Sequence, residues 1–188
     1  ATREAFENLV DDLAWAGDEE YGVVGLLYHP NVTKMAATKS LATATADEMI
    51  SMVNSWISKP IDLTKGIETP DTIALTIEAY RALATKRIPD LQITVLKYLQ
   101  EQNPFITAWE WVPKFTGLAK NPRTGATAST NVGVVYKRDR SKLKLEIPVD
   151  FEQFPGQERN LEIVVPCHGR IAGCIIPKPL SVVVIDGV

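Results

Sequence analysis

Apolar residues near the start of the chain recur at the spacing of one helix face: Phe6, Leu9, Val10 and Leu13. Gly17 is predicted to end this helix, because glycine readily adopts the left-handed conformation that closes helices. No capping signal precedes the helix, since Thr2 has no Glu or Gln three residues later. We therefore expect the chain to begin inside a longer helix and to be a fragment of a longer protein.

The middle of the chain is predicted to hold helices and one short strand. Residues 34–44 are rich in Thr, Ala and Ser and are predicted to be irregular. Thr45 and Glu48 form a capping box, and the apolar helix face that follows is predicted to end at Pro60. A strand over residues 73–77 and helices over residues 80–87 and 94–102 are predicted to follow.

Strand periodicity dominates the second half. The clearest alternation runs along residues 142–149, where every second residue is Leu, Ile or Val. Further strands are predicted over residues 105–112, 132–137, 161–165, 171–176 and 181–185. Helices first and strands later, without strict alternation of the two, predict an α+β fold.

Composition excludes several classes of protein. The 188 residues are 45% hydrophobic, which is enough for a folded core of one or two domains. A formal net charge of −3 argues against an electrostatic nucleic-acid binder, which would carry a basic surface. No apolar run is long enough for a membrane span, and two cysteines do not form a disulfide framework.

A long segment without periodicity, residues 113–131, is the first candidate functional site. It is basic, and five of its residues are candidates for a functional loop: Lys114, Gly117, Lys120, Arg123 and Gly125. Loops of this length inside a compact domain are usually functional or disordered. A phosphate site is disfavoured because the spacing of the P-loop motif is absent, and a mobile surface loop is the simplest alternative.

Catalytic and metal-binding groups are weakly indicated. His29 is expected to be a hydrogen-bonded turn residue. Cys167, His168 and Cys174 match no common zinc spacing, and the cysteines are expected to lie in the core. The acidic turn at residues 18–20 is expected to be solvated. No catalytic residue, metal site or cofactor is therefore predicted, and Trp109 and Trp111 are expected to pack a sheet face on a helix.

Several motifs together resemble a known family. The segment G-D-E-E-Y-G-V-V-G-L-L-Y-H-P-N-V spans residues 17–32, and further matching segments lie at residues 70–75, 94–104, 147–151, 170–173, 179–182 and 185–188. In this order they resemble the phage-type major capsid proteins of the Johnson fold. The family's N-terminal arm and extended hairpin loop, which precede the spine helix, have no counterpart here, and no crosslinking Lys/Asn pair is identified.

The resemblance implies a fold and a function. A peripheral domain, with the spine helix and long antiparallel strands, would comprise residues 1–36 and 139–175. An axial domain, with a central sheet flanked by helices, would comprise residues 37–138 and 176–188. The protein would be a structural subunit rather than an enzyme. It would assemble in the bacterial host cytoplasm into the pentamers and hexamers of a phage or prophage head.

In the family, a loop of the axial domain lies where equivalent copies meet, so the resemblance makes the basic segment over residues 113–131 a candidate inter-subunit loop. The resemblance also implies partners. These are further copies of the chain, scaffold, portal or head-completion proteins, and DNA enclosed without sequence-specific binding. Two other functions stay open: an encapsulin-like nanocompartment shell that encloses a cargo enzyme, and a small α+β enzyme or ligand-binding protein.

Overall fold

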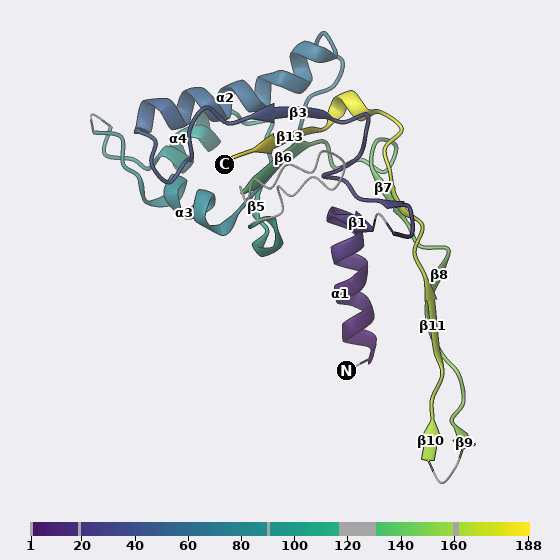
Figure 1. The fold of residues 1–188 in the computed structure, drawn as a ribbon. Helices are drawn as coiled ribbons and strands as arrows, with labels where there is room; N and C mark the ends of the chain where they lie inside the picture. The colour runs from purple at the N-terminus through teal and green to yellow at the C-terminus, as the bar shows by residue number, and fades with distance from the viewer. Residues whose placement is uncertain (1, 19, 90, 117–130, 160–161) are drawn as a thin grey trace. The chain divides into compact units, whose positions relative to one another are not determined.

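The computed structural model of the chain divides into two compact units (Figure 1). It describes every residue except 1, 19, 90, 117–130 and 160–161. The smaller unit contains residues 1–29 and 144–175, and the larger unit contains residues 30–143 and 176–188. Each unit is thus assembled from segments that are far apart in the sequence.

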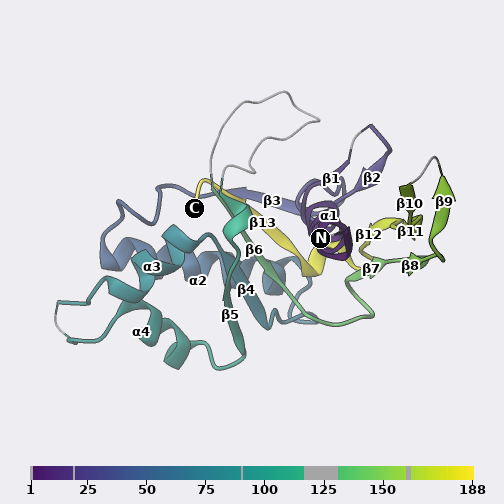
Figure 2. The same cartoon turned by 90° about the horizontal axis from the view of Figure 1, so that it is seen from below.

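A five-stranded mixed sheet forms the centre of the larger unit (Figure 2). Its strands lie in the order β3 (Thr33–Ala36), β13 (Val183–Asp186), β6 (Val132–Tyr136), β4 (Thr72–Leu75) and β5 (Ala108–Trp111). The two edge strands are parallel to their neighbours, whereas β6 is antiparallel to both β13 and β4. All five residues of β6 are buried, which fits a central strand covered on both faces.

Three helices pack in the larger unit, and each begins at a threonine cap. They are α2 (Ala46–Leu63), α3 (Ile77–Thr85) and α4 (Val95–Gln102). The hydroxyls of Thr45, Thr76 and Thr94 accept a backbone N–H of the first turn, which satisfies a donor that has no partner within the helix. Helix α2 packs against β6 and β13, and α3 and α4 pack against each other.

The hydrophobic core lies where these helices meet the sheet. Its fully buried members come from all three helices, the sheet and the segment before α2, and include Leu41, Trp56, Ile57, Ile73, Leu83, Leu99, Val135 and Ile185. Trp109 packs partly against this core, as expected, whereas Trp111 is half exposed. Short 3-10 helices, η1 (Pro113–Phe115) and η2 (Pro179–Ser181), complete the larger unit.

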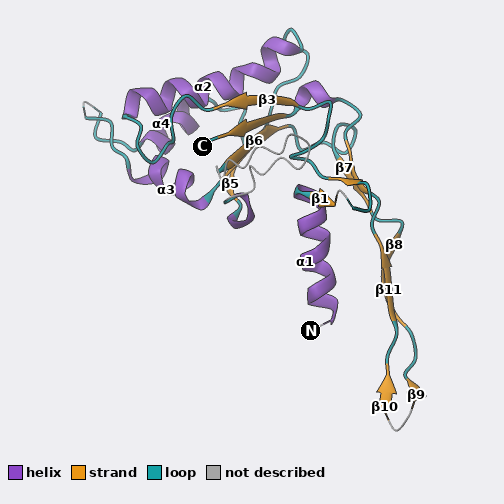
Figure 3. Cartoon of the chain, viewed as in Figure 1, coloured by secondary structure: helices purple, strands orange, loops and turns teal. Residues whose placement is uncertain are grey.

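The smaller unit combines one helix with a two-stranded ribbon (Figure 3). Helix α1 (Thr2–Trp15) has no buried residue and leads into the short hairpin of β1 (Gly17–Asp18) and β2 (Val23–Val24). Three successive antiparallel pairs form the ribbon: β7 (Lys144–Glu146) with β12 (Gly173–Ile175), β8 (Val149–Gln153) with β11 (Cys167–Arg170), and β9 (Gln157–Arg159) with β10 (Glu162–Val164). The phenyl rings of Phe6 and Phe151 connect helix and ribbon, with centroids 5.6 Å apart.

Several predicted boundaries are wrong. The helix predicted over residues 80–87 is α3, which runs from Ile77 to Thr85, so residue 77, expected to end a strand, is helical. Residues 33–36 form β3 rather than an irregular segment, because they pair with β13 from the far end of the chain. Pro60 lies inside α2, which continues to Leu63. The predicted strand over residues 142–149 is interrupted after Glu146, before Pro148, a residue that has no backbone N–H to donate to a ladder.

The division into units also differs in detail from the domain boundaries expected from the sequence. Residues 30–36 and 139–143 belong to the larger unit. Both segments were predicted to belong to the same domain as the helix and the ribbon. Strand β3 belongs to the larger unit because its hydrogen-bonding partner, β13, is a strand of the central sheet.

Candidate functional site

The glycine-bounded motif that follows α1 is a tight backbone joint. A methyl group on Gly17 or Gly25 would lie 2.4 Å from backbone atoms of the opposite segment, so neither position has room for a side chain. The amides of Leu26 and Leu27 donate to the carbonyls of Ala14 and Trp15, at 2.9 and 3.0 Å, and thereby satisfy the end of the helix. Both leucines are buried, so the motif serves the fold of the smaller unit.

The acidic turn within this motif is held by its own backbone. The Asp18 carboxylate accepts the amides of Glu20 and Tyr21, at 2.9 and 3.4 Å. This is a local turn interaction that aspartate commonly makes. His29 lies at the end of the same segment, and residue 19 is outside the described residues. The turn therefore has a structural explanation that needs no bound cation.

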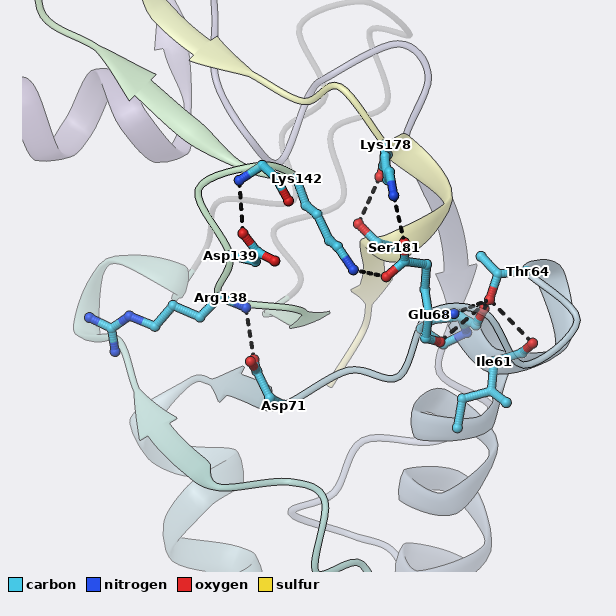
Figure 4. Close-up of polar contacts among 11 residues, drawn as sticks. Ile61, Thr64, Glu68, Asp71, Arg138, Asp139, Lys142, Lys178 and Ser181 are labelled. Atoms are coloured by element: carbon cyan, nitrogen blue, oxygen red, sulfur yellow. Dashed lines mark hydrogen bonds and ion pairs between the residues drawn. The ribbon is translucent and has the colours of Figure 1, made fainter.

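A buried ion cluster is the most distinctive polar feature of the larger unit (Figure 4). Glu68, only 5% exposed, binds the ammonium of Lys142 through one carboxylate oxygen and that of Lys178 through the other, the latter at 3.0 Å. The Lys142 side chain is also buried, whereas that of Lys178 is half exposed. Burial is the main cause that lowers the pKa of Lys142, and the charge of Lys178 lowers it further.

Backbone and hydroxyl contacts fix the positions of Glu68 and Lys178. The Glu68 amide donates to the hydroxyl of Thr64, at 3.1 Å, and that hydroxyl donates to the Pro60 carbonyl of α2, at 2.7 Å. The Ser181 hydroxyl donates to the Lys178 carbonyl at 2.7 Å. One carboxylate therefore joins three segments: the loop after α2, the loop after β6 and the segment before β13 (Figure 4).

A second carboxylate holds the start of the loop after β6. Asp71 accepts the backbone N–H of Arg138 at 2.8 Å (Figure 4). The Arg138 guanidinium donates to Glu110 of β5 at 3.0 Å. Further along this loop, Asp139 accepts the backbone N–H of Ser141, and this hydrogen bond is the main cause that lowers the pKa of Asp139. The loop that carries Lys142 is thus fixed along its length.

The candidate loop over residues 113–131 has well-anchored ends. Phe115 is completely buried at one end. At the other end, the Asn131 carbonyl accepts the amides of Gly187 and Val188, and its side chain donates to Glu78. Of the five candidate residues, Lys114 is described as part of η1, while Gly117, Lys120, Arg123 and Gly125 lie outside the described residues.

The ribbon of the smaller unit carries an unusual number of exposed apolar side chains. In and next to its last pair of strands, β9 and β10, the exposed apolar residues are Phe154, Ile163, Val164 and Val165. A two-stranded ribbon is at best marginally stable by itself in water. Exposed apolar groups clustered on such an element are typical of a protein–protein contact surface. The ribbon is therefore the second candidate site for assembly.

The cysteines and His168 do not form a metal site within the part of the chain that the structure describes, where no group of three candidate ligands occurs. Cys167 is exposed on β11, which corrects the expectation of a core residue, and Cys174 is half buried on β12. Burial raises the pKa of the Cys174 thiol to about 11, which disfavours the reactive thiolate.

Among the described helices, none has the length and apolar character needed to cross a bilayer.

The fold resembles that of solved capsid structures. The chain superposes on a structure titled the capsid of Myoviridae phage XM1 with a TM-score of 0.87 and 16% identity, covering 100% of this chain and 63% of that one. It matches a virus-like particle from Pyrococcus furiosus with a TM-score of 0.59 and 16% identity, covering 89% and 62%. A structure titled Mycobacterium phage Ogopogo matches with a TM-score of 0.50 and 17% identity, covering 96% and 67%.

These likenesses define an α+β fold of the capsid type, and the chain spans under two thirds of the length of the first two structures. The family model described as major capsid protein matches residues 1–188. The chain therefore belongs to the major capsid protein family, a family of structural proteins rather than enzymes, as the sequence motifs indicated. A comparison with curated protein sequences gives no match.

Sequence reasoning missed the ion cluster completely. Glu68, Lys142 and Lys178 lie up to 110 positions apart, and no local pattern relates them. The one available signal was indirect: Lys142 occupies a position in a strand-like alternation where a solvent-facing side chain was expected. In the sequence, the exposed apolar residues of the ribbon show only the ordinary alternation of a strand.

Proposed function

We propose that the chain is the shell-forming part of a major capsid subunit, which assembles with further copies into the pentamers and hexamers of a phage head that encloses DNA. The observation that carries this proposal is the family match over the whole chain. The exposed apolar ribbon supports it, since such a surface is stabilised when a neighbouring molecule covers it. The smaller unit would be the peripheral domain and the larger unit the axial domain.

Assembly into a closed shell requires contacts of a particular kind. When one surface of a subunit binds a different surface of the next identical subunit, repetition of this contact forms a closed ring if the rotation between neighbouring subunits is a whole fraction of a full turn. The long segment over residues 113–131 is a suitable inter-subunit loop in the larger unit, because its described ends are held, Phe115 by complete burial and Asn131 by hydrogen bonds to Gly187 and Val188. Shortening residues 117–129 is expected to reduce assembly much more than it reduces the stability of the subunit.

The decisive experiment is electron microscopy of the full-length protein, expressed together with its neighbouring genes. Closed icosahedral particles that protect DNA from nuclease are the expected result. Closed particles filled with protein and lacking DNA would instead indicate a nanocompartment shell. A protein that stays monomeric under all conditions would contradict both forms of the proposal.

A further inference from the structure

An open pocket of about 500 Å³ lies beside the buried ion cluster. Its walls are mainly apolar and come from Leu63, Ile67, Pro179 and Leu180, with Glu68 at its side. Ile67 is 79% exposed, and Leu63 and Leu180 are also exposed, so the pocket displays apolar surface to solvent. All of these residues belong to the larger unit.

The charged groups around this pocket are mainly positive. Lys65 and Lys178 line it together with Glu68, and the buried Lys142 contacts Glu68 without lining the pocket. Glu68 is shared between two lysines, and the exposed carboxylate of Asp139 lies near Lys178. The residues that line the pocket thus include two lysines and one carboxylate, and one positive charge remains. The pocket is complementary to an apolar side chain accompanied by a carboxylate.

The far end of the ribbon carries such a combination on one face. Ile163 is 75% exposed and lies directly opposite Glu158 in the register of β9 and β10, so both side chains project from the same face. The side chains of Ile163 and Val165 both lie next to Gly156, since a methyl group at this glycine would be 3.0 Å from Ile163 and 3.8 Å from Val165. Ile163 and Val165 therefore form an apolar knob with Glu158 beside it.

We propose that the knob formed by Ile163 and Val165 of one copy of the chain docks in the pocket at Ile67 of a second copy. Ile163 packs against Leu63, Ile67 and Leu180, and Glu158 lies opposite Lys65 and Lys178. The contact joins two different surfaces, which is the kind of contact that propagates around a ring. This inference rests on the proposed function and specifies one of its interfaces.

Charge reversal tests the electrostatic half of this contact. Glu158→Lys and Lys65→Glu are each expected to reduce the yield of closed particles at least tenfold, because each places like charges opposite one another. The double variant is expected to recover most of the yield. Glu162→Lys is the matched control, because residue 162 neighbours Ile163 in β10 and projects from the opposite face of the ribbon. Thermal unfolding of each purified subunit checks that the exposed substitutions leave the fold intact.

A disulfide tests the apolar half in the full-length protein. Particles are assembled from a mixture of two Cys167→Ser chains, one with Ile67→Cys and the other with Ile163→Cys, and are then oxidised. A disulfide-linked pair of the two chains is expected. Leu91→Cys replaces Ile67→Cys in the control mixture, since Leu91 is also an exposed apolar residue of the larger unit.

The outcomes separate this inference from the proposed function. If wild-type particles form while Glu158→Lys and Lys65→Glu also assemble fully, or while Ile67→Cys crosslinks no more than Leu91→Cys, the docking contact is overturned and the shell function stands. If the wild-type protein forms no particles, the shell function fails, and the crosslink in concentrated solution still decides whether the two surfaces meet.

Discussion

At the scale of single residues, the buried carboxylate of Glu68 has the greatest expected influence on stability. Removing one member of a buried ion pair leaves the other charge without compensation, which typically costs about 3–5 kcal/mol. Glu68→Gln is expected to fall near the lower end, about 3 kcal/mol, because the half-exposed Lys178 can be solvated. Chemical denaturation measures the loss.

Glu101→Gln serves as the matched control, since Glu101 lies exposed on α4 and such substitutions usually change stability by less than about 0.5 kcal/mol. Equal stabilities of the two variants would show that the buried Lys142 finds another partner. The sequence alone does not distinguish Glu68 from Glu101. The charge of Glu68 is visible there, whereas its burial against Lys142 depends on two distant loops.

The glycines of the joint after α1 allow a second prediction at this scale. Gly25→Ala is expected to destabilise the hairpin of β1 and β2 severely, because the new methyl group would lie 2.4 Å from backbone atoms of residues 16 and 17. Gly22→Ala is the milder control: its φ of +68° disfavours a side chain, yet nothing lies within 4 Å of the added atom. Amide hydrogen exchange of Leu26 and Leu27 reports the difference. Equal exchange in both variants would mean that the joint can shift to make room.

At the scale of elements, the start of α2 carries a pH dependence. The backbone amide of Thr45, and then the ammonium of Lys39, lower the pKa of Glu48 from 4.5 to about 2. A carboxyl whose pKa is lower in the folded state contributes stability above its unfolded value, and that stability is lost as the pH falls through the folded value.

The stability difference between the wild-type protein and Glu48→Gln is therefore expected to be constant above pH 5 or so, to shrink below about pH 4.5, and to vanish near about pH 2. Thermal unfolding of both proteins across this range measures the difference. A difference that stays unchanged down to pH 2 would contradict the assigned role of the capping box. Both partners of the box lie close in sequence, which explains why it could be predicted.

Elements defined by local chemistry were predictable, and those defined by distant pairing were not. Thr94 has the cap and the apolar spacing of a helix, and α4 follows it as predicted. Residues 33–36 carry no strong strand pattern and become β3 only through β13, about 150 positions later. Pro60 was expected to end α2, but its ring is buried and the helix continues for three more residues, so packing outweighs the lost hydrogen bond.

At the scale of the whole molecule, the order of the motifs was sufficient to indicate the family, although no single motif was specific. The candidate assembly surfaces could not be predicted in this way. Such a surface consists of apolar side chains that are exposed to solvent in the single chain, and which side chains are exposed depends on the fold. Ile163 and Ile67 look like ordinary strand and loop residues in the sequence, and their exposure emerges only when neighbouring segments are placed.

The uneven burial of the two units leads to the last prediction. Helix α1 contributes no buried residue and the described residues of β10 are all exposed, whereas β6 is buried throughout. Backbone amides in poorly buried elements open at low free-energy cost, so the smaller unit is expected to exchange hydrogen rapidly in the free subunit. If neighbouring copies cover the ribbon, assembly should slow exchange in Glu162–Val164 at least tenfold and leave Val132–Tyr136 unchanged. Mass spectrometry of subunits and particles measures both segments in one experiment. Equal exchange of the ribbon in the two states would show that it stays uncovered in the shell, and its apolar residues would then require a partner other than the capsid subunit.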